Sequence, residues 1–133
     1  MKVYNSIIRP AIEYSAVVYH SMISEELSER LEGTQRQAMR IIYGWGRDIR
    51  QTMENKGVEL LSERREEIVL KFALKNESNP RFGKKWFKKT EDTGREVRNG
   101  TRGKYFEQFC RTERLRKKPI NYMTRRLNEH YSN

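Results

Sequence analysis

The sequence is poor in the residue types that build disulfides, metal sites and catalytic centres. Of its 133 residues one is cysteine, Cys110, and two are histidine, His20 and His130. A single cysteine excludes an internal disulfide, and these three residues match no recognised spacing of metal ligands. No Gly-rich phosphate loop precedes an expected helix, and no Ser, His and Asp set indicates a triad. We therefore expect no catalytic residue, no metal and no cofactor in this chain.

Long apolar runs are also missing. No run approaches the roughly 18 residues that a membrane span requires, and the first residues lack the apolar region of a secretory signal. Together with the lone cysteine, this favours an intracellular protein, nuclear or cytoplasmic and not secreted. No membrane partner is expected.

Acidic residues are scarce in the last 55 positions. Residues 1–78 hold 12 basic and 12 acidic side chains, whereas residues 79–133 hold 16 basic and 6 acidic ones, so the net charge of +10 lies in the second part. Apolar residues follow the opposite trend, with 33 in the first part and 14 in the second. We predict a helical bundle core over residues 1–78, and a basic segment over residues 79–133 that binds a partner or stays loose.

The stretch from Ser24 to Gly44 carries the clearest helix pattern. Ser24 is a preferred N-cap residue, and Gly44 can close the helix. Apolar or small residues recur at spacings of three and four, which predicts that one stripe faces the core. That stripe consists of Leu27, Leu31, Thr34, Ala38, Ile41 and Ile42. An ordinary core helix is favoured over one that directs Arg36 and Arg40 toward phosphate.

Further helices are expected on both sides of this one. Residues 3–20 predict a helix that bends near Arg9, because Pro10 removes a backbone donor. Residues 49–56 predict a short helix capped by Asp48, and residues 63–76 a longer one capped by Ser62. Pro119 can open a final amphipathic helix. Residues 90–103 have too few apolar side chains to bury enough surface for one ordered conformation. The expected fold is all-α: a small antiparallel helical bundle with a basic, partly irregular C-terminal extension.

Two clusters in the basic segment are candidates for binding nucleic acid. In residues 84–89, KKWFKK, cations flank aromatic rings, a pattern that suits single strands; a membrane surface, or docking of both rings on the helices, remains the alternative. The run from Arg111 to Lys118 with Arg125 and Arg126 is an electrostatic footprint for phosphate, or a solvated basic tail. The candidate residues are Lys84, Lys85, Trp86, Phe87, Lys88, Lys89, Arg111, Arg114, Arg116, Lys117, Lys118, Arg125 and Arg126.

Several stretches resemble a known family. YNSIIRPAIEYSAVVYH near the start, LEGTQRQAMRIIYG at residues 31–44 and RTERLRKKPINYMTRRLN at residues 111–128 are similar to the C-terminal, post-palm region of jockey-type non-LTR retrotransposon reverse transcriptases. Arg64, Arg65 and Glu66 resemble that family's Arg-Arg-Glu motif. The front pattern is matched by Ile8, Arg9, Pro10, Glu13, Tyr14 and His20, while Tyr19 stands where tryptophan is common.

The resemblance implies a thumb-side part of an RNA-directed DNA polymerase. Its implied partners are RNA or an RNA–DNA hybrid and the upstream polymerase core of the same polyprotein, and Mg²⁺ is implied only for that core. The two aspartates, Asp48 and Asp92, lie far apart, so this chain alone is not expected to be an enzyme. The expected function is a non-catalytic fragment that helps hold nucleic acid. The alternative is a helical protein-interaction module, or a relic open reading frame with no independent activity.

Overall fold

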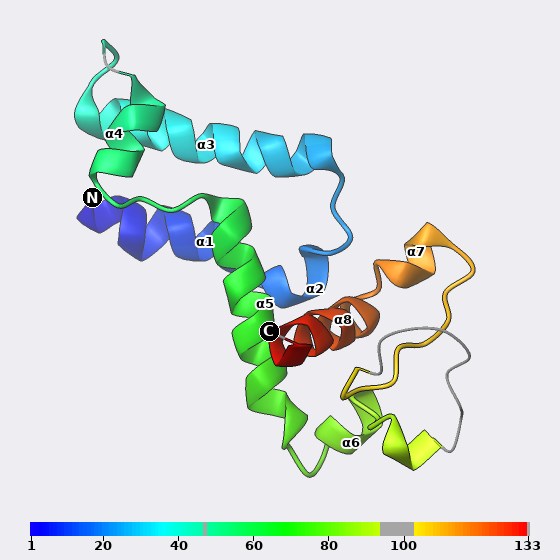
Figure 1. Ribbon diagram of the computed structural model, residues 1–133. Helices are drawn as coiled ribbons and strands as arrows, with labels where there is room; N and C mark the ends of the chain where they lie inside the picture. The colour runs from blue at the N-terminus through cyan, green and yellow to red at the C-terminus, as the bar shows by residue number, and fades with distance from the viewer. Residues whose placement is uncertain (47, 94–102, 133) are drawn as a thin grey trace. The chain divides into compact units, whose positions relative to one another are not determined.

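The computed structural model describes residues 1–46, 48–93 and 103–132, and within these ranges the chain is mostly helical and contains no strand (Figure 1). The predicted all-α class is confirmed. The expectation for residues 90–103 falls mainly on positions outside the described ranges. The elements are η1 (Tyr4–Ile8), α1 (Arg9–Glu13), α2 (Ala16–Tyr19), α3 (Glu25–Tyr43), α4 (Ile49–Asn55), α5 (Leu61–Glu77), α6 (Gly83–Trp86), η2 (Glu91–Thr93), α7 (Glu113–Arg116) and α8 (Pro119–Ser132).

Contacts group the chain into two compact units. Unit 1 comprises residues 1–16 and 23–67, and unit 2 comprises residues 17–22 and 68–133. Helix α5 contributes residues to both units. The division predicted at residue 78 rests on composition and stays a prediction, whereas these units are defined by contacts.

In unit 1, α3 begins and ends where the sequence predicts. The hydroxyl of Ser24 accepts a hydrogen bond from the backbone N–H of Leu27 at 3.2 Å, and Gly44, at φ +99°, ends the helix. The predicted apolar stripe is wrong for most of its residues, however: of the six, Ala38 alone is buried. The buried residues of α3 are Glu32, Gln35, Ala38 and Met39, while Leu27 and Ile41 are exposed.

Two polar side chains explain why the buried face of α3 differs from the predicted one. The carboxylate of Glu32 accepts hydrogen bonds from the backbone N–H groups of Leu61, at 3.2 Å, and Ser62, at 2.7 Å. The amide of Gln35 donates to the carbonyl of Glu59 at 3.0 Å. Glu32 therefore caps the start of α5, where the unsatisfied N–H groups of a helix favour negative charge. The prediction that α5 begins after a Ser62 cap is wrong, because its cap comes from another helix.

The first helical segment is interrupted later than predicted. Pro10 lies in the first turn of α1, directly after the π-helical turn η1, and the chain stays helical across Arg9. The break comes at Tyr14, which has an extended ψ of 131°, and at Ser15, which has a φ of +57°. Pro10 has no N–H to donate to the preceding turn, and that preceding turn is the wider π-helical turn η1.

The core of unit 1 joins η1, α3 and α4. Its buried residues are Tyr4, Ala38, Met39, Ile49 and Met53. Figure 1 shows α4 folded back against the end of α3. Asp48 caps α4 by accepting from the N–H of Arg50 at 2.9 Å, and Gly57 follows the helix at φ +62°, so this short helix is confirmed.

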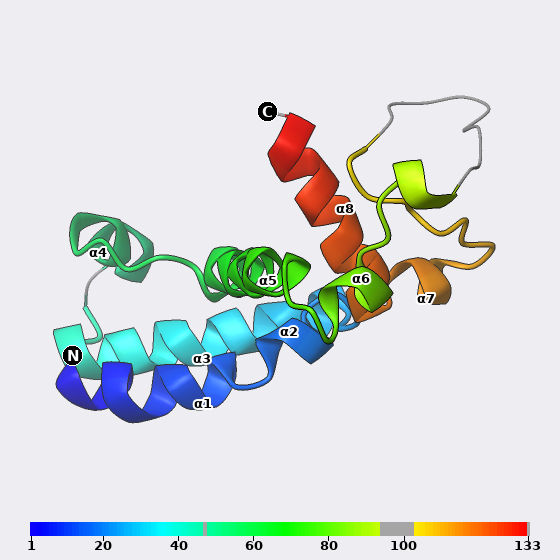
Figure 2. The same cartoon turned by 90° about the horizontal axis from the view of Figure 1, so that it is seen from below.

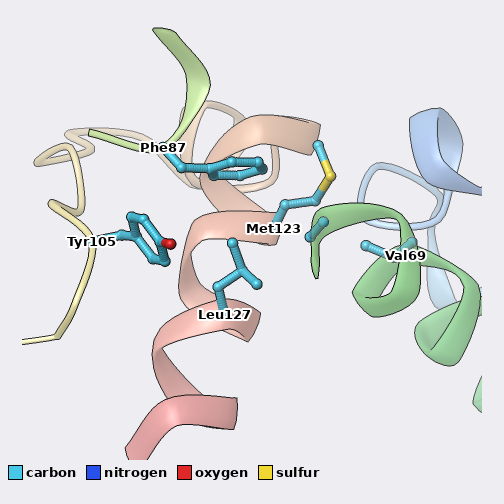
Figure 3. Close-up of a cluster of buried hydrophobic side chains, with 6 residues drawn as sticks. Val69, Phe87, Tyr105, Met123 and Leu127 are labelled. Carbon is cyan, nitrogen blue, oxygen red and sulfur yellow. The ribbon is translucent and has the colours of Figure 1, made fainter. Parts of the chain in front are cut away.

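The core of unit 2 lies between α5 and α8. In Figure 3, Met123 and Leu127 of α8 point between Val69 of α5 on one side and Phe87 and Tyr105 on the other. These five residues and Ala73 are buried. Helix α8 begins at Pro119 as predicted.

The stretch around Tyr105 is fixed to α8 by one side chain. The amide of Asn128 accepts from the backbone N–H of Tyr105 and donates to its carbonyl, both at 2.8 Å. The hydroxyls of Tyr105 and Tyr131 both donate to the carboxylate of Glu77 on α5, at 2.8 Å and 2.6 Å. Burial and the hydrogen bond to Glu77 raise the pKa of Tyr105 above its usual value.

Candidate nucleic-acid interface

Unit 2 carries a groove of about 770 Å³ that joins the two candidate clusters. Its walls come from α6 and Lys88, from Phe106 and Gln108, and from the region where α7 leads into α8. Figure 2 shows α7 beside the first turn of α8. The lining residues are Lys85, Trp86, Lys88, Phe106, Gln108, Leu115, Lys118, Pro119, Ile120, Asn121 and Thr124.

Trp86 forms the aromatic wall of the groove. Its ring stacks on that of Phe82, with centroids 5.0 Å apart and planes inclined by 19°, and the guanidinium of Arg81 lies 5.9 Å from the Phe82 centroid. Phe87 contacts Trp86 edge-on at 6.5 Å. Trp86 is therefore half-buried and held from two sides while part of it lines the groove.

Helix α6 can take this position because a glycine begins it. A Cβ atom on Gly83 would lie 2.3 Å from the backbone oxygen of Glu77, so any other residue would collide with the end of α5. The side chain of Asn79 orders the preceding turn by accepting from the N–H of Arg81 at 2.9 Å. Backbone contacts, rather than side-chain packing alone, thus set the place of Trp86.

Phe87 does not line the groove. Only 3% of its surface is exposed, and it packs in the core with Met123 and Leu127. The prediction that both rings of KKWFKK contact nucleic acid is therefore wrong for Phe87. Adjacent residues at the end of a short helix point in different directions. The sequence pattern did not indicate that Phe87 would be buried in the core while Trp86 would reach the surface.

The opposite wall is built by α7 and the first turn of α8. Thr112 caps α7 by accepting from the N–H of Leu115 at 3.3 Å. The side-chain amide of Asn121 donates to the carbonyl of Leu115 at 2.8 Å, which ties the two helices together. Lys118 precedes Pro119 at this junction, so the end of the predicted basic run reaches the groove.

Phe106 is a groove residue that sequence reasoning missed. It lies in an extended stretch that runs beside residues 88–90: the N–H of Phe106 donates to the carbonyl of Lys88 at 2.8 Å, and that of Thr90 donates to the carbonyl of Lys104 at 3.3 Å. An isolated bridge between Lys89 and Tyr105 belongs to the same pairing. The only sequence signal is the aromatic run around Tyr105, which does not reveal its partner.

The charge of the groove is of one sign. Lys85, Lys88 and Lys118 are exposed, and among the residues that the structure describes no carboxylate lines the groove. Within the described ranges none of these three lysines has an acidic partner within 4.0 Å, in contrast to Arg126, which pairs with Glu129 at 2.6 Å. The groove thus combines three unpaired cations with an aromatic surface.

The other candidate residues do not line the groove. Lys84, Lys89, Arg111, Arg114, Arg116 and Lys117 are exposed elsewhere on unit 2, while Arg125 and Arg126 on α8 are half-buried. Arg125 donates to the carbonyl of Arg116 at 3.4 Å. The structure therefore brings together Lys85, Trp86, Lys88 and Lys118 out of the predicted set.

Arg64 and Glu13, which both belong to the motifs that carry the family resemblance, form an ion pair inside unit 1. The guanidinium of Arg64 donates to Glu13 at 2.6 Å and to Glu59 at 2.9 Å, and these contacts raise its pKa. Arg65 is fully buried and donates to the hydroxyl of Ser28 at 2.8 Å. These arginines hold the fold of unit 1.

Among the residues that the structure covers, no group of three or more His, Cys, Asp or Glu side chains is placed to hold a metal ion. No helix in these ranges has both the length and the apolarity to cross a bilayer. Comparison with protein-family models, curated proteins and solved structures gives no match to this chain.

Proposed function

We propose that this chain is a non-catalytic, nucleic-acid-binding part of a retroelement reverse transcriptase, which helps hold the RNA template or the RNA–DNA hybrid. The family proposal rests on the resemblance in residues 3–128, and the Mg²⁺-dependent chemistry would belong to an upstream polymerase core. Binding would use phosphates and stacking, and would depend little on base sequence.

One observation carries this proposal: three lysines that have no acidic partner among the described residues, and a tryptophan from a different part of the chain than Lys118, line one groove. Lysines that pair with phosphates release condensed counterions, so affinity falls steeply with salt. An exposed aromatic ring adds stacking energy that any base can supply. A solvated basic tail needs neither a shared groove nor an aromatic wall.

The test compares two variants that lose the same charge. Lys85→Ala, Lys88→Ala and Lys118→Ala together remove three cations from the groove, whereas Lys2→Ala, Arg50→Ala and Lys56→Ala remove three exposed cations from unit 1. Fluorescence anisotropy with a short labelled RNA measures binding at about 50 mM and about 200 mM salt. For a single strand, three phosphate contacts contribute a factor of about 20 to the fall in affinity between these two salt concentrations, and the groove variant should lack this factor.

The groove variant should bind weakly and respond little to salt, while the unit 1 variant should behave like the unmodified chain. Equal weakening of both variants would indicate attraction to net charge alone. No binding of the unmodified chain at low salt would reject the proposal.

A second candidate function, a protein-interaction module, is favoured by exposed apolar side chains in unit 1. Val3 and Ile7 lie one turn apart on the first helical segment, and Leu27 and Ile41 lie on α3, all exposed. Scattered exposed apolar residues are common, but two helical faces of this kind suit a partner surface. If this is the function, Leu27→Gln with Ile41→Gln should reduce self-association in sedimentation velocity and leave RNA binding unchanged.

A further inference from the structure

We infer that the groove of unit 2 binds an unpaired strand, with a base against Trp86 and the neighbouring phosphates on Lys85, Lys88 and Lys118, and that it does not bind the paired hybrid. This inference rests on the proposed function and assigns the ligand class of the same site.

The position of Trp86 is the first reason. Phe82 stacks on one face of its ring and Phe87 packs against it at a right angle, so the surface left for a ligand is the part that lines the groove. A base in a duplex has both faces stacked on its neighbours, and must leave that stack before it can reach a ring inside a hollow. The base of a single strand can turn outward without breaking a pair.

The apolar share of the lining is the second reason. Besides Trp86, the groove presents Phe106, Leu115, Pro119 and Ile120. A paired helix is contacted through its phosphates and 2′-hydroxyl groups, which gain nothing from apolar side chains. Bases have apolar faces, so this lining suits a base that is inserted between the α6 wall and the α8 wall.

The arrangement of the lysines is the third reason. Lys85 and Lys88 lie on the α6 side, and Lys118 lies at the start of α8. Cations on both sides of an aromatic surface match a strand that crosses the groove, with its base inside and its phosphates at the rim. The volume of about 770 Å³ also falls in the range of about 300–1,000 Å³ that is typical of pockets for small ligands, so a short piece of strand fits.

The experiment uses Trp86 as its own reporter. The chain has two tryptophans, and Trp45 is 71% exposed in unit 1, so Trp45→Phe leaves Trp86 as the only tryptophan, which can be excited selectively over the tyrosines. Four ligands of equal length are titrated: a single-stranded RNA, a blunt RNA–DNA hybrid, a single-stranded DNA, and the same DNA with abasic sites throughout. The abasic strand keeps the phosphates and lacks the bases.

The single strands should quench Trp86 and bind more tightly than the hybrid, and the hybrid should leave the emission unchanged. The abasic strand should bind about 5- to 150-fold more weakly than the intact DNA, since one stacked base is lost. Trp86→Leu, which keeps an apolar side chain, should remove this difference, whereas Phe109→Ala, at a ring 82% exposed in unit 2, should keep it. Thermal melting of each variant verifies folding.

Equal affinity and equal quenching by the blunt hybrid would overturn the inference, and so would equal binding of the intact and abasic strands. If either result is found while the groove lysine variant still binds weakly, the proposed function stands and only the ligand class is wrong. If the groove lysine variant binds every ligand as well as the unmodified chain does, the proposed function itself fails.

Discussion

Replacing Glu32 by glutamine should destabilise unit 1 strongly although it changes few atoms. The carboxylate receives the first two N–H groups of α5, at 3.2 Å and 2.7 Å, and lies 3.9 Å from the guanidinium of Arg65. Arg65 is 0% exposed, and its Nε and Nη1 atoms have no hydrogen-bond partner among the described residues. Glutamine keeps the shape of the side chain and removes the charge that balances Arg65.

The magnitude follows from the burial of this pair. Removal of one member of a buried ion pair leaves an uncompensated charge and costs about 3–5 kcal/mol. Since domains of this size are stable by about 5–15 kcal/mol, the variant should lose about a fifth or more of its stability. Urea denaturation followed by circular dichroism at the helical band measures the loss.

Glu29→Gln is the matched control, because Glu29 is on the same helix and pairs with Arg36 at the surface. Exposed ion pairs contribute about 0–1 kcal/mol. A second variant, Glu32→Gln with Arg65→Met, removes both charges and should recover part of the stability. If Glu32→Gln costs no more than Glu29→Gln, Glu32 neither caps α5 nor balances Arg65, and the reasoning is refuted.

Three further predictions concern unit 2. Gly83→Ala should cost about 1–3 kcal/mol in urea denaturation and weaken RNA binding, because its Cβ would meet the backbone of Glu77 at 2.3 Å; unchanged RNA affinity would contradict the role of α6. Asn128→Ala should cost about 1–3 kcal/mol in the same assay, since it leaves the backbone N–H and C=O of Tyr105 unsatisfied. Tyr105 has a pKa above its usual value of 10.0, so its neutral form stabilises the fold below that pH and this contribution is lost as the pH rises further. The melting temperature should therefore fall more between about pH 9 and about pH 11 in the unmodified chain than in Tyr105→Phe, and equal falls would exclude this contribution.

Local signals in the sequence predicted where several elements begin and end. Ser24, Gly44, Asp48 and Pro119 act where they stand, through their own side chains or backbone angles, and the structure confirms the ends that they mark. These effects need no knowledge of the rest of the chain.

The buried face of α3 could not be predicted in this way. The apolar spacing pointed to Leu27 and Ile41, whereas the structure buries Glu32 and Gln35. Their partners are the backbone of Glu59, Leu61 and Ser62, more than 20 positions away in the sequence. A hydrophobic pattern treats a buried carboxylate as an exposed one, so a polar contact between helices is invisible to it.

The sequence predicted two parts of the groove lining separately. The sequence indicated the cation and aromatic cluster around Trp86 and the basic run ending at Lys118, but not that the two share one groove. Their meeting depends on the pairing of residues 88–90 with residues 104–106, which brings Phe106 into the lining. Pairing of this kind is set by tertiary contacts and has no local signature in either stretch.

The contact of Trp86 with Phe82 and Phe87 also affects the entropy of the proposed binding. A side chain that is ordered only when the ligand arrives costs about 0.5–1.5 kcal/mol in lost freedom. Trp86 is already held by its two aromatic neighbours in the free protein, so the proposed binding of a base would not have to order this side chain. Its neighbour Phe87 lies in the buried core of unit 2, so the proposed binding surface is attached directly to that core.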